Sequence, residues 1–206
     1  MRASELLDER GSAAIEAAVS SAERATSGEI VPVIVERSDN YAELRFGAAA
    51  LVAFAAGALA LLLAPELDHW LVPTQLGVFV ASAWLFGQPA LLRWLIPADV
   101  AAKRVARAAG LAFHEAGLVE TRDRTGILIY VSLLEHRVVV LADRGIHARV
   151  EAGTWDAVVA RVVAGIVAQR AEAGLADGIR LCGEILSRHF PSRPDDLNEL
   201  PNSPRS

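Results

Sequence analysis

Two apolar stretches decide how this chain is organised: FGAAALVAFAAGALALLLAP, residues Phe46 to Pro65, and LVPTQLGVFVASAWLFGQPALL, residues Leu71 to Leu92. Neither stretch contains a charged residue. About 20 apolar residues in a helix, each adding about 1.5 Å, cross the hydrocarbon core of a bilayer, which is about 30 Å thick. Helices in the core of a soluble protein usually keep a polar stripe, and these stretches have none. The sequence therefore predicts two membrane-spanning helices.

The five residues between the stretches, Glu66 to Trp70, leave room only for a turn, so the two helices are expected to pack antiparallel as a hairpin. Gln88 and Pro89 lie in the last turns of the second stretch and predict a kink close to the membrane interface. Small residues recur at four-residue intervals on both stretches, which would let the two backbones approach closely. They are Ala49, Ala53 and Gly57 on the first stretch and Gly77 and Ala81 on the second.

The distribution of basic residues predicts the orientation of this hairpin. The turn contains no Lys or Arg, whereas basic residues both precede and follow the hairpin. Loops that carry Lys and Arg stay in the cytoplasm. We therefore expect a two-pass protein of the inner (plasma) membrane, with both termini cytoplasmic and the lipid bilayer as its first partner. The basic residues concerned are Arg37, Arg45, Arg93, Lys103, Arg104 and Arg107.

The rest of the chain alternates between helical and strand patterns. Neither side of the hairpin offers a complete sheet, so the first strand is expected to join the later two in one small mixed sheet covered by helices. The predicted fold class is an α/β/α sandwich interrupted by a transmembrane helical hairpin. The expected parts are 1–45 and 97–190 for the sandwich, 46–96 for the hairpin, and a disordered tail, 191–206. The helices are expected at 12–25, 100–116, 155–169 and 175–190, and the strands at 29–36, 126–133 and 137–142.

Composition and motifs exclude several classes of function. The net charge of −5 gives no reason to expect nucleic acid as a partner. The single cysteine, Cys182, cannot form an internal disulfide, and its place on the apolar stripe of the last helix predicts a buried side chain. The sequence contains none of the glycine-rich phosphate loops, nucleophile elbows or HExxH zinc motifs.

Acidic residues at strand ends are the remaining candidates for a site. Asp39 follows the first strand, Asp123 precedes the second and Asp143 ends the third. Ligands bind in the loops beyond strand ends in α/β sheets, and converging carboxylates would hold Ca²⁺ or Mg²⁺. Asp is also a favoured turn and cap residue, so a structural role stays open. Arg124 and Arg144 stand next to two of these aspartates and would instead favour an anion.

The soluble part resembles the TPM domain, found in bacterial membrane proteins and in plant thylakoid lumen proteins. The resemblance runs from about Ser12 to Phe190 and rests on TSGEIVPVIVE, on RTGILIYVSLLEHRVVVLADRGI and on a final helix containing GLADGI. The two-span insertion is similar to that of a short membrane-bound subgroup of bacterial members. The resemblance implies an α/β/α sandwich. Members of the family include acid phosphatases, proteins that bind divalent cations, and proteins of membrane-complex repair or accessory subunits, so it implies no single activity.

Two departures from the family's pattern bear on the site. The family's Asp-Asn-Gly corresponds to Asp123 followed by Arg124, Thr125 and Gly126, and its usual Gly-Tyr-Gly corresponds to the segment from Asp143 to Gly145. Arg124 and Arg144 would both bring positive charge to the strand-end loops that carry these aspartates. We therefore expect a membrane-anchored module at the cytoplasmic face that binds a protein partner, a small ligand or an ion. A phosphatase acting on phosphate monoesters and an accessory subunit of a membrane complex are the alternatives.

Overall fold

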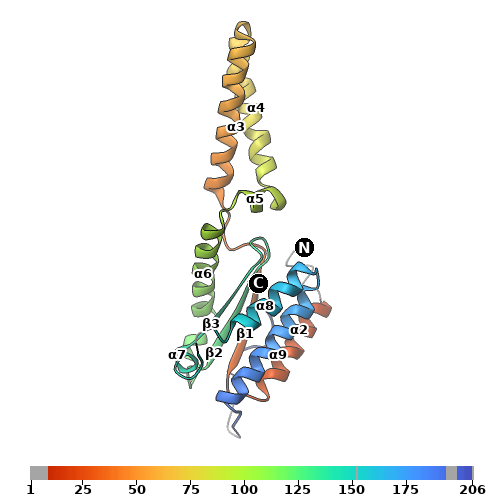
Figure 1. Ribbon diagram of the computed structural model, residues 1–206, viewed down its shortest axis with the longest axis vertical. Helices are drawn as coiled ribbons and strands as arrows, with labels where there is room; N and C mark the ends of the chain where they lie inside the picture. Colours follow the sequence, from red (N-terminus) through yellow and green to blue (C-terminus); the bar gives the residue numbers. More distant parts are fainter. Residues whose placement is uncertain (1–8, 152, 194–198, 206) are drawn as a thin grey trace. The chain divides into compact units, whose positions relative to one another are not determined.

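The computed structural model describes residues 9–151, 153–193 and 199–205. The chain divides into two compact units, which are described separately here. One unit combines residues 1–38 with 102–206, and the other comprises 39–101. The first unit is therefore built from two stretches of chain that flank the second (Figure 1).

The first unit contains a three-stranded mixed sheet in its described residues. Strand β1 (Glu29–Val35) pairs in parallel with β2 (Gly126–Ser132), which pairs antiparallel with β3 (Arg137–Ala142). In this register Ile30 lies beside Ile127, and Val131 lies beside Val138. The prediction that the first strand joins the later two across the apolar insertion is confirmed.

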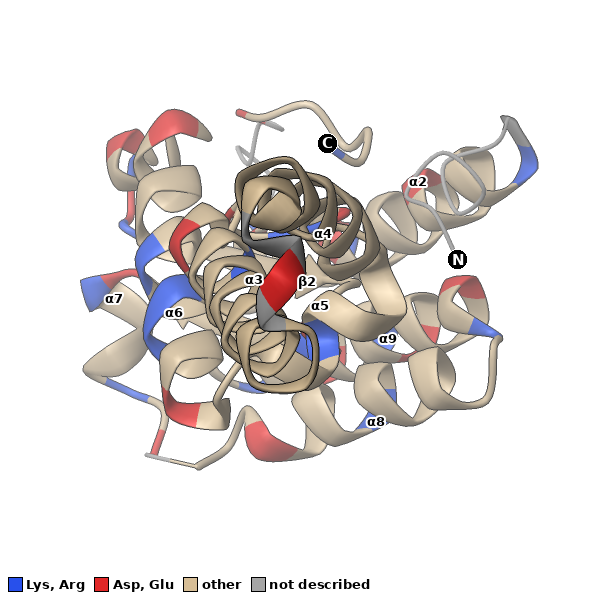
Figure 2. Ribbon diagram, turned by 90° about the horizontal axis from the view of Figure 1, so that it is seen from above, with Lys and Arg blue, Asp and Glu red and all other residues tan. Residues whose placement is uncertain are grey.

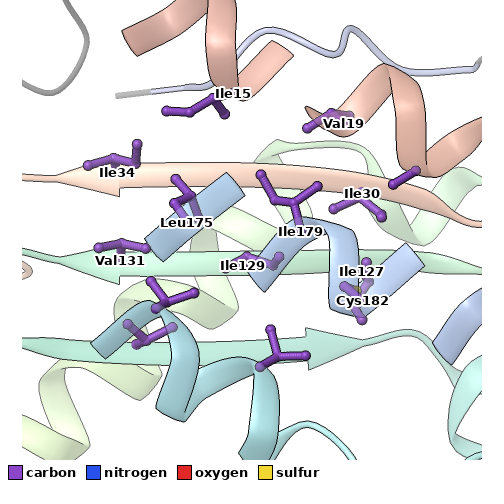
Figure 3. Close-up of a cluster of buried hydrophobic side chains, with 14 of the residues drawn as sticks. Ile15, Val19, Ile30, Ile34, Ile127, Ile129, Val131, Leu175, Ile179 and Cys182 are labelled. Carbon is purple, nitrogen blue, oxygen red and sulfur yellow. The ribbon is translucent and has the colours of Figure 1, made fainter. Parts of the chain in front are cut away.

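One face of the sheet packs against three helices, α2 (Glu9–Glu23), α8 (Asp156–Val167) and α9 (Ala171–His189). Alternate strand residues point to this face because side chains alternate along a strand. Figure 3 shows them meeting the apolar stripes of the helices, and Cys182 lies in this core as predicted. The labelled members are Ile15, Val19, Ile30, Ile34, Ile127, Ile129, Val131, Leu175, Ile179 and Cys182.

The opposite face of the sheet packs against α6 (Ala98–Glu115) and the short helix η2 (Leu118–Glu120). Val31, Leu128 and Tyr130 on the strands meet Val105 and Phe113 on α6. Helices thus cover both faces, so β1 and β2 are almost wholly buried, whereas β3 is mostly half-buried. This is the expected α/β/α layering. A short helix after β3, α7 (Arg144–His147), was not predicted.

The structure differs from the expected disordered tail in the part that it describes. Residues 199–205 run beside β1, where the N–H of Ile34 donates to the carbonyl of Arg205 at 2.9 Å. The N–H of Arg205 donates in turn to the carbonyl of Pro32 at 3.1 Å. Leu200 packs against the core beneath α6, and Pro191 forms a bridge with Thr26. The predicted disorder of residues 194–198 and 206 lies outside the described residues.

The second unit contains α3 (Ala42–Leu63), η1 (Pro65–Trp70), α4 (Leu71–Phe86) and α5 (Pro89–Leu95). Helices α3 and α4 pack against each other. The buried residues of α3 are the predicted Ala49, Ala53 and Gly57. A methyl group on Gly57 would lie 2.1 Å from the side-chain nitrogen of Gln75, so the glycine admits this side chain.

The corresponding prediction for the second helix is wrong. Gly77 and Ala81 are exposed, and nothing lies within 4 Å of a methyl group placed on Gly77. The buried residue of α4 is Ala83. A four-residue interval recurs on more than one face of an alanine-rich helix, so the interval alone did not identify the packed face.

The second apolar stretch, Leu71 to Leu92, is broken into two helices at the kink predicted for Gln88 and Pro89. The helix ends at Phe86, and α5 resumes at Pro89 with a bend of 93° between the two. Pro89 has no N–H to donate, and its ring pushes Gln88 into an extended conformation. Among the described helices, α3 alone is long and apolar enough to cross a membrane, while α4 and α5 pass that test only when taken together.

Candidate functional site

The structure brings together two of the three predicted carboxylates. Asp123 precedes the amino end of β2, and Asp143 follows the carboxyl end of β3. These strands are antiparallel, so both residues lie at one end of the sheet. Asp39 follows the carboxyl end of β1, which is parallel to β2, so it leaves the sheet from the opposite end. The prediction that all three converge is therefore wrong, because the sequence did not reveal the direction of pairing.

Asp143 is a buried carboxylate that begins a helix. Its side chain is 6% exposed, and Oδ1 accepts a hydrogen bond of 2.7 Å from the N–H of Arg144 at the start of α7. Oδ2 lies 3.9 Å from Nη1 of Arg124 and has no hydrogen-bond partner among the described residues. A carboxylate at a helix N-terminus stabilises the unpaired N–H groups there. Asp143 therefore caps α7, which is the structural role that the sequence left open for it.

Asp123 pairs with an arginine that the sequence did not identify. Nη1 of Arg193 donates to Oδ2 of Asp123 at 2.9 Å, and both side chains are substantially exposed. Arg193 belongs to the stretch expected to be disordered, and no pattern in the sequence links it to Asp123. The side chain of Arg144 is exposed, and that of Arg124 approaches Asp143 as described above.

This arrangement gives no support to a predicted Ca²⁺ or Mg²⁺ site. Each carboxylate is near a guanidinium, which neutralises its charge and competes with a cation. The described residues also include no group of three or more His, Cys, Asp or Glu side chains placed to hold a metal ion. The end of the sheet instead presents alternating acidic and basic groups.

A pocket of ≈ 350 Å³ lies beside these loops, at the amino end of β1. The side chain of Arg193 lines it and also pairs with Asp123, so the pocket and the loop before β2 share a residue. The hydroxyl of Thr125 donates to the carbonyl of Ser27 at 2.9 Å and ties the two regions together. The lining residues are Ser20, Glu23, Arg24, Thr26, Ser27, Gly28, Glu29, Ser192, Arg193 and Asn202.

Glu23 and Glu29 give this pocket its unusual electrostatics. Oε1 of Glu23 accepts from the N–H of Ile30 at 2.9 Å, and Oε1 of buried Glu29 accepts from the N–H of Glu199 at 3.0 Å. Burial raises the pKa of Glu23 from 4.5 to about 7; the Ile30 hydrogen bond opposes this shift and the nearby Glu29 adds to it. Glu29 begins β1, whereas Glu23 stands six residues earlier at the end of α2 and no pattern in the sequence suggested it.

A second polar cluster lies at the other end of the sheet. The hydroxyl of Ser38 donates to that of Ser132 at 3.0 Å and lies 3.3 Å from the Tyr130 hydroxyl. Ser132 donates to Glu135, whose other oxygen accepts from the N–H of Ser38 at 3.0 Å. Burial is the main cause that raises the pKa of Tyr130. These bonds join the end of β1 to the turn between β2 and β3, which is a structural role.

Comparisons with known proteins identify a structural neighbour. Neither a protein-family model nor a curated protein sequence matches the chain. Among solved structures, the chain is similar to the NMR structure of BA42 protein from the psychrophilic bacterium Bizionia argentinensis, with a TM-score of 0.61. The match has 23% sequence identity and covers 97% of this chain and 94% of the other. At this identity the likeness shows a common fold and not a common function.

Proposed function

We propose that the protein is a membrane-anchored, TPM-like binding module. The unit 39–101 inserts in the inner (plasma) membrane by two passes, and the α/β unit works at the cytoplasmic face. There it binds a protein partner or a small ligand at the end of the sheet that carries Asp123, Asp143 and Arg193.

The observation that carries the proposal is the apolar surface of α3. Its mean hydropathy reaches 2.4, and large apolar side chains project from it, including Phe54 at 71% and Leu62 at 78% exposure. Soluble proteins rarely leave a contiguous apolar surface of this extent in water. In Figure 2, α3 and α4 are tan almost throughout, whereas α6 carries basic positions. Lipid contact accounts for this surface.

Helix lengths support two passes. The 22 residues of α3 extend about 33 Å, and the 16 residues of α4 extend about 24 Å. A short apolar helix is accommodated by local thinning of the bilayer at modest cost. The connection η1 contains no Lys or Arg, so the positive-inside rule favours its exit on the outer side.

A charge in the middle of α3 tests the anchoring. Lysine at the centre of a membrane helix costs about 2.5–3.5 kcal/mol of insertion energy. Phe54→Lys should therefore shift the protein from the carbonate-resistant membrane pellet to the degraded or soluble fraction, while Phe54→Leu should stay in the pellet. If the parent itself is extracted by alkaline carbonate, or if Phe54→Lys is as membrane-bound as Phe54→Leu, the anchoring proposal is wrong.

A ligand titration tests the binding part. A ligand at 100 times its Kd stabilises the fold by about 2.7 kcal/mol, which shifts thermal unfolding of the detergent-solubilised protein. Phosphate, Ca²⁺ and Mg²⁺ should be compared on the parent, Asp123→Ala and Arg144→Ala. The arginines beside these carboxylates offer the paired N–H donors that suit an anion, so phosphate should raise the Tm and the cations should not. A Tm that none of the three additions changes would favour the alternative of an accessory subunit. In a separate activity assay, turnover of phosphate monoesters by the parent that is lost in Asp123→Asn would establish the phosphatase instead.

A further inference from the structure

The break between α4 and α5 is held in a defined geometry. Gln88 is extended, with φ −70° and ψ 134°, and Pro89 occupies the first position of α5. The two helices meet at 93°. A bend at a proline can be a loose hinge, so its rigidity depends on what satisfies the backbone groups that the break releases.

The side chain of Arg45 satisfies one of those groups. In an unbroken helix the carbonyl of Ala83 would accept from the N–H of Gly87, which here donates to Trp84 and Leu85. Nε of Arg45 donates to the Ala83 carbonyl instead, at 2.6 Å. A methyl group on Gly87 would lie 3.0 Å from Cζ of Arg45, so glycine leaves room for the guanidinium. The bend is therefore pinned by α3.

The faces of α5 differ sharply. Leu92 is 2% exposed and packs inside the unit, whereas Trp94, two positions later, is 84% exposed. Residues two apart on a helix point in nearly opposite directions. The guanidinium of Arg45 also lies 5.1 Å from the centre of the Phe46 ring, so an aromatic and a basic group occupy the base of α3 as well. Aromatic and basic side chains gather where a membrane meets water.

We infer that α5 does not cross the membrane but lies along its cytoplasmic surface, with the Trp94 ring in the glycerol-ester and headgroup layer of phospholipids. The inference rests on the proposed membrane anchoring. If α4 crosses the bilayer, a helix at 93° to it runs close to the membrane plane. Its buried side faces the helices α3 and α4, and the indole of Trp94, which is apolar with one N–H donor, suits the interfacial layer.

Nitroxide depth measurements test this placement on the full chain. The native thiol, Cys182, is buried, so single introduced cysteines can be labelled selectively. Trp94→Cys and Ala90→Cys report on α5, and the second of these keeps the tryptophan. Val80→Cys, near the middle of α4, is the deep control, and Ser203→Cys is the aqueous control. The protein is reconstituted in phosphatidylcholine–phosphatidylglycerol vesicles, and collisions with oxygen and with a water-soluble nickel complex are compared.

Both labels on α5 should give a depth between those of the two controls, with several-fold less nickel contact than Ser203→Cys and several-fold more than Val80→Cys. Labels on α5 as deep as Val80→Cys would show that α5 continues the span. Labels as exposed to nickel as Ser203→Cys would show that α5 lies in water. Either result overturns the inference. Nickel contact at Val80→Cys equal to that at Ser203→Cys would instead show that the membrane anchoring itself fails.

Discussion

Glu23 shows how folding changes one carboxylate. It lies at the end of α2 in a partly buried pocket, where it accepts the N–H of Ile30 and faces Glu29. The pKa of its side chain rises from 4.5 to about 7, mainly because burial disfavours the charged form. Between these two values the folded state holds a proton that the unfolded state has lost, so the free energy of unfolding falls as the pH rises.

The variant Glu23→Gln should remove this part of the pH dependence, since the amide keeps an oxygen for the Ile30 N–H but does not titrate. We expect the parent to lose stability relative to Glu23→Gln as the pH rises from about 4.5 to about 7, and the difference to level off above that. Denaturant unfolding of the full chain in mild detergent measures it. Glu16→Gln, an exposed change on the same helix, is the control. Parallel pH profiles for parent and Glu23→Gln would contradict the assignment.

Gly145 is a second residue whose identity is restricted, because the backbone around it leaves no room for a side chain. A methyl group there would lie 2.6 Å from the carbonyl oxygen of Arg124 and 2.7 Å from that of Asp123, while the N–H of Gly145 donates to the first of these. Backbone atoms cannot move aside as a flexible side chain can. The glycine therefore lets the loop before β2 and the start of α7 pack together, which sets the separation of Asp123 and Asp143.

Gly145→Ala should destabilise the α/β unit by about 1–3 kcal/mol, the usual cost of overpacking. Gly110→Ala is the matched control, because nothing lies within 4 Å of a methyl group at this position in α6. Alanine is the better helix former, so the control should gain about 0.5–1 kcal/mol. The denaturant midpoints of the two variants, each compared with that of the parent, measure both effects. Equal effects of the two substitutions would show that the close approach at Gly145 is absent in solution.

At the scale of elements, the residues 199–205 act as a backbone partner for β1. The bonds run from Ile34 N–H to Arg205 and from Arg205 N–H to Pro32. Edge strands expose unpaired backbone groups that favour aggregation, and this segment covers part of the free edge of β1. The segment thus contributes to the sheet although it is not itself a strand of it.

A chain stopped after Glu199 should expose this edge. The N–H of Ile34 loses its acceptor, so we expect its hydrogen exchange, followed by mass spectrometry of peptides from β1, to accelerate about tenfold, equivalent to about 1.4 kcal/mol. Arg205→Ala keeps the backbone bonds and should exchange like the parent. Unchanged exchange in β1 of the shortened chain would mean that the segment does not pair with the strand.

The elements also show what the sequence can and cannot reveal. Strands β1, β2 and β3 were predictable because β-branched runs of that length have few alternatives. The pairing of Arg205 with β1 could not be predicted, because it joins main-chain atoms and therefore leaves no pattern of side chains in the sequence. The break after Phe86 was visible only as a kink at Pro89, because apolar composition continues through it. At the site, Asp123 and Asp143 could be found as strand-end acids, but Arg193 and Glu23 reach the site through tertiary packing alone.

At the scale of the whole molecule, the sheet depends on chain from both sides of the unit 39–101. Strand β1 precedes that unit and pairs with β2, which follows it. A unit that crosses the membrane twice begins and ends on the same side of it, so both of its connections to the sheet domain lie on one face of the membrane. This agrees with the proposal that both halves of the α/β unit lie on the cytoplasmic side, to which the absence of Lys and Arg from η1 also points.

Cysteine labelling in intact cells tests this account most directly. The parent should not react with a membrane-impermeant maleimide, because its one thiol, Cys182, is buried and burial raises its pKa. Glu66→Cys, in the exposed connection η1, should be labelled in intact cells, and Ser203→Cys should be labelled only after the membrane is permeabilised. Labelling of Ser203→Cys with protection of Glu66→Cys would reverse the orientation. Equal behaviour of the two positions before permeabilisation would contradict a two-pass anchor.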